Sequence, residues 1–216
     1  MTSRRALAVA CVAGGLAIAT PAVGRSAPRP SLLEPSTLVA RAPAKFSVSF
    51  ATTKGVFVVS VRRAWAPHGA DRFYNLVRNR FYDGASFFRV VPGFVVQFGI
   101  SPRPAVSRAW LDATIPDDRV RLSNKRGTLA FAATNAPNSR TTQVFVNLGD
   151  NRQLDSSGFA PFARVVRGMR VVDRLYAGYG ELPDQGKIVT QGRPYLDRRF
   201  PKLDRITIAR VVRGSG

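Results

Sequence analysis

Short segments with β-strand character recur along most of the chain, and they constrain its fold more than any other feature. The clearest two are residues 46–51, which alternate apolar and polar side chains as a strand with one buried face does, and the apolar run at residues 56–61. Thr53-Lys54-Gly55 between them predicts a hairpin turn. Six further segments are read as strands, so we expect eight in all: 46–51, 56–61, 86–91, 94–98, 127–132, 143–148, 159–166 and 205–212.

So many strands predict a mainly β fold. Helical periodicity is found at residues 69–80 and in a shorter stretch at 169–177. Eight strands can close into a barrel just wide enough for side chains to fill, and closure removes exposed sheet edges. We therefore expect a closed eight-stranded antiparallel β-barrel with two flanking helices. Residues 101–126 are read as irregular, and residues 178–204 as a long loop rich in glycine and proline.

The first residues have the pattern of an export signal. Two arginines precede an uncharged apolar run at residues 6–19, and small residues follow before Arg25. The run is short for a transmembrane helix, which needs roughly 20 apolar residues, although a retained membrane anchor stays an alternative. We expect a signal peptide at 1–24, a Pro/Ala-rich linker at 25–44 and one folded domain at 45–213. From this pattern we expect a periplasmic or secreted protein that has no membrane span after processing.

Charge and rare residues narrow the function classes. The chain has 33 Lys and Arg against 13 Asp and Glu, a net charge of +20. This charge fits either a polyanionic partner or a solvated basic surface. Because basic and aromatic residues are not interleaved at regular spacing, we expect at most weak, nonspecific polyanion binding. One cysteine, Cys11, and one histidine, His68, cannot assemble a Cys/His zinc site, so no metal is predicted.

The segment from Phe87 to Gln97, FFRVVPGFVVQ, places a charge in the middle of an apolar strand. Alternation puts Phe87, Arg89 and Val91 on one face. Burying an arginine is costly unless its charge is used, although a surface arginine that buries only its aliphatic stem is the common alternative. Arg89 is therefore a candidate functional residue.

This segment resembles the signature strand of the cyclophilins, F-x-R-x-x-P-G-F-x-x-Q. Two later blocks, Gly127 to Leu148 and Gly149 to Phe162, resemble further segments of that family, the second as found in bacterial members. The resemblance extends over about residues 46–212. It implies a cyclophilin-type barrel and peptidyl-prolyl cis-trans isomerase activity, which needs no cofactor.

The resemblance also implies which residues form the site. Arg89 matches the catalytic arginine, which would stabilise the twisted amide during rotation about an Xaa-Pro bond. An apolar slot for the proline ring, with polar neighbours that orient the arginine and the peptide, is implied for Phe94, Val95, Gln97, Ala133, Gln143, Phe145, Leu154 and Phe159. For each aromatic residue, ordinary barrel core is the alternative.

Three positions depart from the family pattern. Val95 stands where a methionine is usual, Gln153 where many members carry a tryptophan, and Phe159 where many carry a histidine. These changes leave the arginine and most of the apolar slot intact. We expect them to alter substrate preference more than the basic activity.

The leading hypothesis is a monomeric isomerase that acts on proline-containing unfolded or flexible polypeptides and assists the folding of exported proteins. Two alternatives remain open. One is a binding module of the same fold without significant catalysis, which an activity assay would separate. The other is a polyanion-binding protein in which isomerase activity is incidental, which a steep salt dependence of binding would favour.

Overall fold

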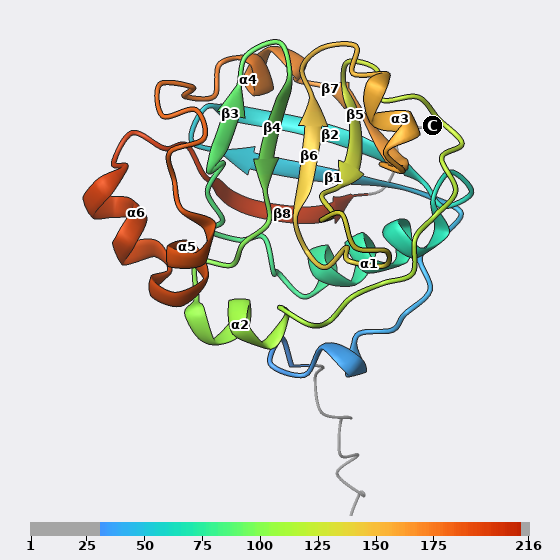
Figure 1. Cartoon of the computed structure of the whole chain (residues 1–216), viewed down its shortest axis with the longest axis horizontal. Helices are drawn as coiled ribbons and strands as arrows, with labels where there is room; N and C mark the ends of the chain where they lie inside the picture. Colours follow the sequence, from blue (N-terminus) through green and yellow to red (C-terminus); the bar gives the residue numbers. More distant parts are fainter. Residues whose placement is uncertain (1–30, 213–216) are drawn as a thin grey trace, which may run out of the picture.

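The alternating segments form strands, and these strands make one continuous antiparallel sheet. The computed structural model describes residues 31–212, and its sheet has the order β3-β4-β6-β5-β7-β2-β1-β8. In Figure 1, β3, β4, β6 and β5 lie in front, and β2, β1 and β8 run across behind them. The strands are β1 (Lys45–Thr52), β2 (Gly55–Arg62), β3 (Arg89–Val91), β4 (Val95–Phe98), β5 (Thr128–Phe131), β6 (Val144–Asn147), β7 (Pro161–Arg167) and β8 (Ile206–Val212).

The sheet curls into a half-barrel, so the expectation of a closed barrel is only partly right. Its end strands, β3 and β8, are not hydrogen-bonded neighbours within residues 31–212. The segments just before them meet instead, through an isolated bridge between Ser86 and Arg205. The physical reason is that the strand expected from residue 86 begins only at Arg89. Phe87 packs in the central core together with Val90, so Phe87 and Arg89 do not share a face as predicted.

The core lies inside the curl and is built from aromatic rings. Phe50 of β1 stacks on Phe57 of β2, with ring centroids 4.8 Å apart. Phe73 meets Phe162 of β7 at 4.9 Å, which joins the helix that carries Phe73 to the sheet. All four side chains are buried, and each contributes about 1.5–3 kcal/mol of hydrophobic stabilisation. The other face of β3, β4, β6 and β5 points away from this core.

Six α-helices surround the sheet in the described part of the chain, where two were expected. The helix predicted at 69–80 is α1, and the stretch at 169–177 contains α4. The other four have four to seven residues each, too short to give a helical period in the sequence. The bounds are α1 (Pro67–Arg78), α2 (Pro104–Ala109), α3 (Gln153–Ser156), α4 (Met169–Asp173), α5 (Gln185–Gln191) and α6 (Arg193–Arg199), with a 3₁₀ turn η1 (Pro35–Thr37).

The segment before β1, whose described part lies within the linker expected at residues 25–44, contacts the domain. Leu38 is buried in the main core. The Trp110 indole Nε1 donates a hydrogen bond to the Leu32 carbonyl at 2.8 Å. The signal peptide expected at residues 1–24 lies outside the described residues. Within residues 31–212, no helix has the length and apolar character needed to cross a membrane.

Candidate active site

A cavity of about 480 Å³ lies on the face of β3, β4 and β6 that points away from the core. Alternation along β4 sends Val96 into the core and Gln97 into the cavity. The sheet register pairs Gln97 with Arg89 on β3 and with Phe145 on β6. The sheet therefore sets a cation, an amide and an aromatic ring side by side in one row.

All nine residues predicted for the site line this cavity. They are Arg89, Phe94, Val95, Gln97, Ala133, Gln143, Phe145, Leu154 and Phe159. Their roles in catalysis and substrate binding stay predictions. Six further lining residues were not identified from the sequence: Leu111, Ala132, Thr134, Ser139, Thr141 and Gln185.

The Arg89 guanidinium is held by three groups. Its Nη1 donates to Gln97 Oε1 at 3.2 Å, and Gln97 Nε2 donates in turn to Gln143 Oε1 at 2.7 Å. Its Nε donates to Glu181 Oε1 at 2.6 Å, and its Cζ lies 5.5 Å from the centroid of the Phe94 ring. The side chain keeps 28% of its surface exposed. The charge is thus directed by polar contacts while it borders the apolar part of the cavity.

The apolar part of the cavity is a small cluster separate from the main core. Val95 and Phe145 are buried, and Phe94, Leu154 and Phe159 pack against them half-buried. Phe145 and Phe159 meet edge to face, with ring centroids 5.6 Å apart. Because this cluster lies on the outward face of the sheet, its aromatic rings are not ordinary barrel core. They form an apolar floor open to the cavity.

Three buried asparagines hold the backbone behind these rings. Asn151 Nδ2 donates to the Phe94 carbonyl at 2.8 Å, and Asn124 Nδ2 donates to the Phe159 carbonyl at 2.8 Å. Asn147 links them, because its Nδ2 donates to Asn124 Oδ1 and its Oδ1 accepts from Asn151 Nδ2. Such a satisfied buried network rigidifies its surroundings. No sequence pattern marked these residues, since asparagine is common in loops and at strand ends.

Asp155 anchors the same network on the α3 side. Its Oδ2 accepts from Ser123 Oγ at 2.6 Å, and its Oδ1 accepts from the Asn124 backbone N–H at 2.9 Å and from Asn124 Nδ2 at 2.8 Å. Burial alone would raise the pKa of Asp155. The hydrogen bonds from Ser123 and Asn124 outweigh burial and hold its pKa below the ordinary value.

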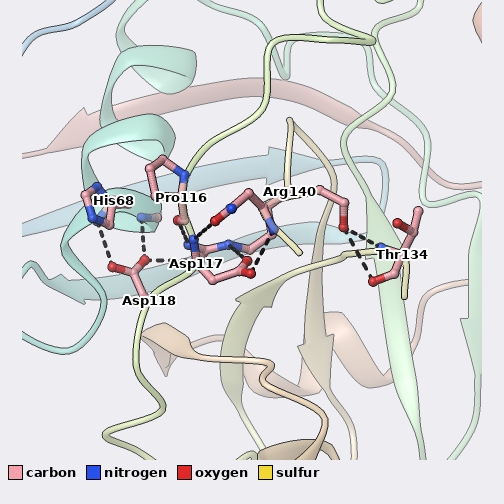
Figure 2. Close-up of polar contacts among 9 residues, drawn as sticks. His68, Pro116, Asp117, Asp118, Thr134 and Arg140 are labelled. Atoms are coloured by element: carbon pink, nitrogen blue, oxygen red, sulfur yellow. Dashed lines mark hydrogen bonds and ion pairs between the residues drawn. The ribbon is translucent and has the colours of Figure 1, made fainter. Parts of the chain in front are cut away.

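The loop between β5 and β6, which forms one wall of the cavity, is fixed from behind by a buried ion pair (Figure 2). Arg140 Nη1 donates to Asp118 Oδ2 at 3.0 Å, and their side chains are only 3% and 2% exposed. Arg140 also donates to the Pro116 carbonyl. The Asp118 carboxylate accepts from the backbone N–H groups of His68 and Gly69, in the first turn of α1. The wall is therefore tied to α1 through one aspartate.

A second arginine supports the same wall. Arg72 of α1 donates through Nη1 to the carbonyls of Ala113 at 2.5 Å and Thr141 at 3.2 Å. Its guanidinium lies 4.9 Å from the centroid of the Trp110 ring. Burial lowers the pKa of Arg72 to about 10, so it stays charged at neutral pH. Farther along the loop, the Thr134 N–H donates to Ser139 Oγ at 2.9 Å.

The chain is similar in sequence to known proteins. A family model described as "Cyclophilin type peptidyl-prolyl cis-trans isomerase/CLD" matches residues 47–195. A peptidyl-prolyl cis-trans isomerase of Acinetobacter baylyi is 36% identical over 140 residues, which are 63% of this chain and 74% of the relative. Peptidyl-prolyl cis-trans isomerase B of Escherichia coli is 34% identical over 164 residues, 73% of this chain and 93% of the relative.

Solved structures agree on the fold. A cyclophilin type peptidyl-prolyl cis-trans isomerase of Cryptosporidium parvum superposes with a TM-score of 0.59 at 15% identity, over 79% of this chain and 99% of the other. A cyclophilin of Hirschia baltica gives a TM-score of 0.59 at 19% identity, over 79% and 75% of the two chains. Since the family model spans well over half of the chain and includes the strands around the cavity, the chain belongs to the cyclophilin-type peptidyl-prolyl cis-trans isomerase family.

Proposed function

We propose that this protein catalyses rotation about Xaa-Pro peptide bonds in the cavity on the β3-β4-β6 face, with Arg89 as the catalytic residue. The uncatalysed barrier of roughly 18–20 kcal/mol comes from amide resonance. Rotation breaks no covalent bond, so the reaction needs neither a nucleophile nor a leaving group. The enzyme has to bind the twisted amide more tightly than the planar one.

One observation carries this proposal: the Arg89 guanidinium borders an apolar floor that fits a proline ring. Its Cζ lies 5.5 Å from the Phe94 ring centroid, and Phe94 packs in one cluster with Phe145. A proline ring seated on this floor would bring the prolyl nitrogen within reach of the guanidinium. Twisting returns lone-pair density to that nitrogen, and a fixed N–H donor stabilises the density as it develops.

The polar residues around Arg89 support the binding of an extended peptide. Gln97 accepts from Arg89 and donates to Gln143, so the two amides form a relay that directs both side chains. Gln143 and Ala133 line the wall opposite β3. We assign to Gln143 and to the backbone at Ala133 the contacts with the peptide on either side of the proline.

The cellular part of the proposal rests on the sequence. The pattern of residues 1–24 supports export, and with it a periplasmic or secreted location and a role in the folding of exported proteins. Unfolded or flexible segments that contain proline are the substrates. We propose a monomer, and we attribute any polyanion binding to the net charge of +20 rather than to a dedicated site.

The test is to measure cis-trans exchange of an uncharged Ala-Pro peptide by NMR, with and without catalytic amounts of the protein. We expect exchange to become fast compared with the uncatalysed rate, which takes tens to hundreds of seconds. A binding module without catalysis would shift the peptide resonances and leave the exchange rate unchanged. That result would overturn the proposed activity in favour of the binding alternative.

A further inference from the structure

Glu181, in the segment between α4 and α5, contacts the proposed catalytic arginine directly. The segment runs beside the edge strand β3, where the Val90 N–H donates to the Gly180 carbonyl at 3.3 Å. The next residue reaches the guanidinium: Glu181 Oε1 lies 2.6 Å from Arg89 Nε and 2.5 Å from Arg89 Nη2. From the sequence, this stretch is part of the long loop expected at residues 178–204, and no pattern there points to Glu181.

The contacts leave a defined set of donors on Arg89. A guanidinium carries five N–H groups in a rigid fork. Glu181 Oε1 accepts a hydrogen bond from Nε and lies within ion-pair distance of Nη2, and Gln97 accepts a hydrogen bond from Nη1. The other N–H groups of the two terminal nitrogens make no hydrogen bond within residues 31–212. Arg89 lines the cavity, so these N–H groups are available to a bound peptide.

The contact of Arg89 with Glu181 is stronger than its contact with Gln97. A charged acceptor makes shorter hydrogen bonds than a neutral one and roughly doubles their strength. The Glu181 contacts, at 2.5 and 2.6 Å, are shorter than the 3.2 Å contact to Gln97. An arginine side chain has several rotatable bonds, so one neutral amide and one ring face would leave the guanidinium free to tilt.

We propose that Glu181 is a positioning residue for the isomerase reaction, which holds the Arg89 guanidinium so that its remaining N–H groups keep the orientation needed by the twisted amide. This inference rests on the proposed function of Arg89. It gives a role to the segment between α4 and α5, which lies at the β3 end of the sheet (Figure 1). Two other roles are possible for the same contact: a tether for the loop, or a carboxylate that competes with the peptide for Arg89.

The variants that separate these roles are Glu181→Ala and Glu181→Gln, with Glu34→Gln as the control. Glu34 is the only other glutamate in the chain, is exposed and does not line the cavity. Glu181 is itself 65% exposed, so both variants should fold. The readout is kcat and KM for an uncharged Ala-Pro peptide, which limits direct charge effects on peptide binding.

We expect Glu181→Ala to lower kcat about tenfold with KM nearly unchanged, because a misplaced donor weakens only the transition state. Glu181→Gln keeps an acceptor oxygen and should recover kcat to within about threefold of wild type. Glu34→Gln should have no effect. The Arg89 Nε–H resonance, identified by its loss in Arg89→Ala, should shift and exchange faster with water in Glu181→Ala.

A double-variant comparison distinguishes failure of this inference from failure of the proposed function. If Glu181 acts through Arg89, the effect of Glu181→Ala should vanish in a protein that already carries Arg89→Ala. An unchanged kcat in Glu181→Ala, beside a large loss in Arg89→Ala, would overturn only the positioning role. A raised KM with unchanged kcat would assign Glu181 to the loop as a tether, and a raised kcat would make it a competitor. No loss in Arg89→Ala itself would overturn the proposed function.

Discussion

At the scale of single residues, the site depends on side chains that leave the same strand in opposite directions. On β6, Val146 joins the main core and Phe145 joins the cavity floor. The two faces can therefore be altered separately. A substitution on the inward face should lower the unfolding free energy, and a substitution on the outward face should weaken substrate binding.

Phe145→Leu tests the apolar floor, with Phe73→Leu as a matched change on the core side. Both side chains are buried, so each variant should lose about 1–2 kcal/mol of unfolding free energy. Only Phe145→Leu should raise KM, by about 2- to 10-fold, because it removes an aromatic face from the proline slot. Urea unfolding and steady-state kinetics on an Ala-Pro peptide measure the two effects. Equal KM values for both variants would contradict the assignment of Phe145 to the floor.

Individual residues were predictable where burying the side chain would cost free energy without a partner, or where the residue matched a motif. Arg89 stood out because a charge in an apolar strand needs a use, and its offset from Phe94 and Gln97 matched a known pattern. Glu181 could not be found in this way. Its partner is 92 residues away, and an acidic side chain in a polar loop is unremarkable until the loop is folded against β3.

At the scale of elements, the loop between β5 and β6 is held by groups outside the cavity. Arg140 is buried, and its Nε has no hydrogen-bond partner within residues 31–212, although Asp117 Oδ1 lies 3.5 Å away. Its main partner, Asp118, also accepts two backbone N–H groups at the start of α1. Arg140 therefore depends on Asp118 more than Asp118 depends on Arg140, because Asp118 keeps its two backbone donors without the arginine.

This inequality predicts an order of stabilities. Asp118→Ala removes the buried partner of Arg140, leaves only the half-exposed Asp117 carboxylate at 3.5 Å, and removes the contacts to α1, so it should cost about 3–5 kcal/mol of unfolding free energy. Arg140→Met should cost less, because the carboxylate keeps its backbone donors and the favourable end of the helix dipole. The double variant should be more stable than Asp118→Ala alone. Urea unfolding ranks the three, and an Arg140→Met variant less stable than Asp118→Ala would refute the order.

The α3 side of the site should respond to acid through Asp155. Its pKa is held below the ordinary value, so the carboxylate stabilises the fold at neutral pH. Protonation removes that stabilisation as the pH falls below the ordinary aspartate pKa of about 3.9 and through the lower folded-state pKa. Asp155→Asn should therefore be less stable than wild type at pH 7, and the gap should narrow in acid. Urea unfolding at several pH values, with the exposed Asp112→Asn as control, tests this; a constant gap would contradict it.

Elements were predictable in proportion to their length and regularity. The hairpin of β1 and β2 was found within one residue at each end, because both strands bury one face and a tight turn joins them. Helices α5 and α6 were missed because each has only seven residues and the segment is rich in glycine and proline. Proline in fact occupies the first turn of α6, where its missing N–H costs nothing.

At the scale of the whole molecule, the strong positive charge and the proposed isomerase site are separate features. The cavity is lined by one charged residue, Arg89, and otherwise by apolar and neutral polar side chains. The remaining cations are spread over the chain. Turnover of a neutral peptide should therefore be insensitive to the overall charge.

Salt dependence tests this separation. Between about 50 and 200 mM salt, binding to heparin should weaken steeply, because it depends on the release of condensed counterions. Over the same range, the isomerase rate on an uncharged Ala-Pro peptide should change little, since no long-range charge steers that peptide. Heparin binding that resists salt would show a dedicated polyanion site and would favour the alternative in which isomerase activity is incidental.

The most direct test of the central claim is the isomerase activity of Arg89→Ala beside wild type, by NMR exchange on an uncharged Ala-Pro peptide. If Arg89 stabilises the twisted amide, the substitution should lower kcat by about 10²–10³-fold, as the loss of one preorganised donor does. The unfolding free energy should stay close to wild type, because the side chain is partly exposed. A folded Arg89→Ala protein that keeps activity within about threefold of wild type, a difference of under 1 kcal/mol in the barrier, would contradict the mechanism.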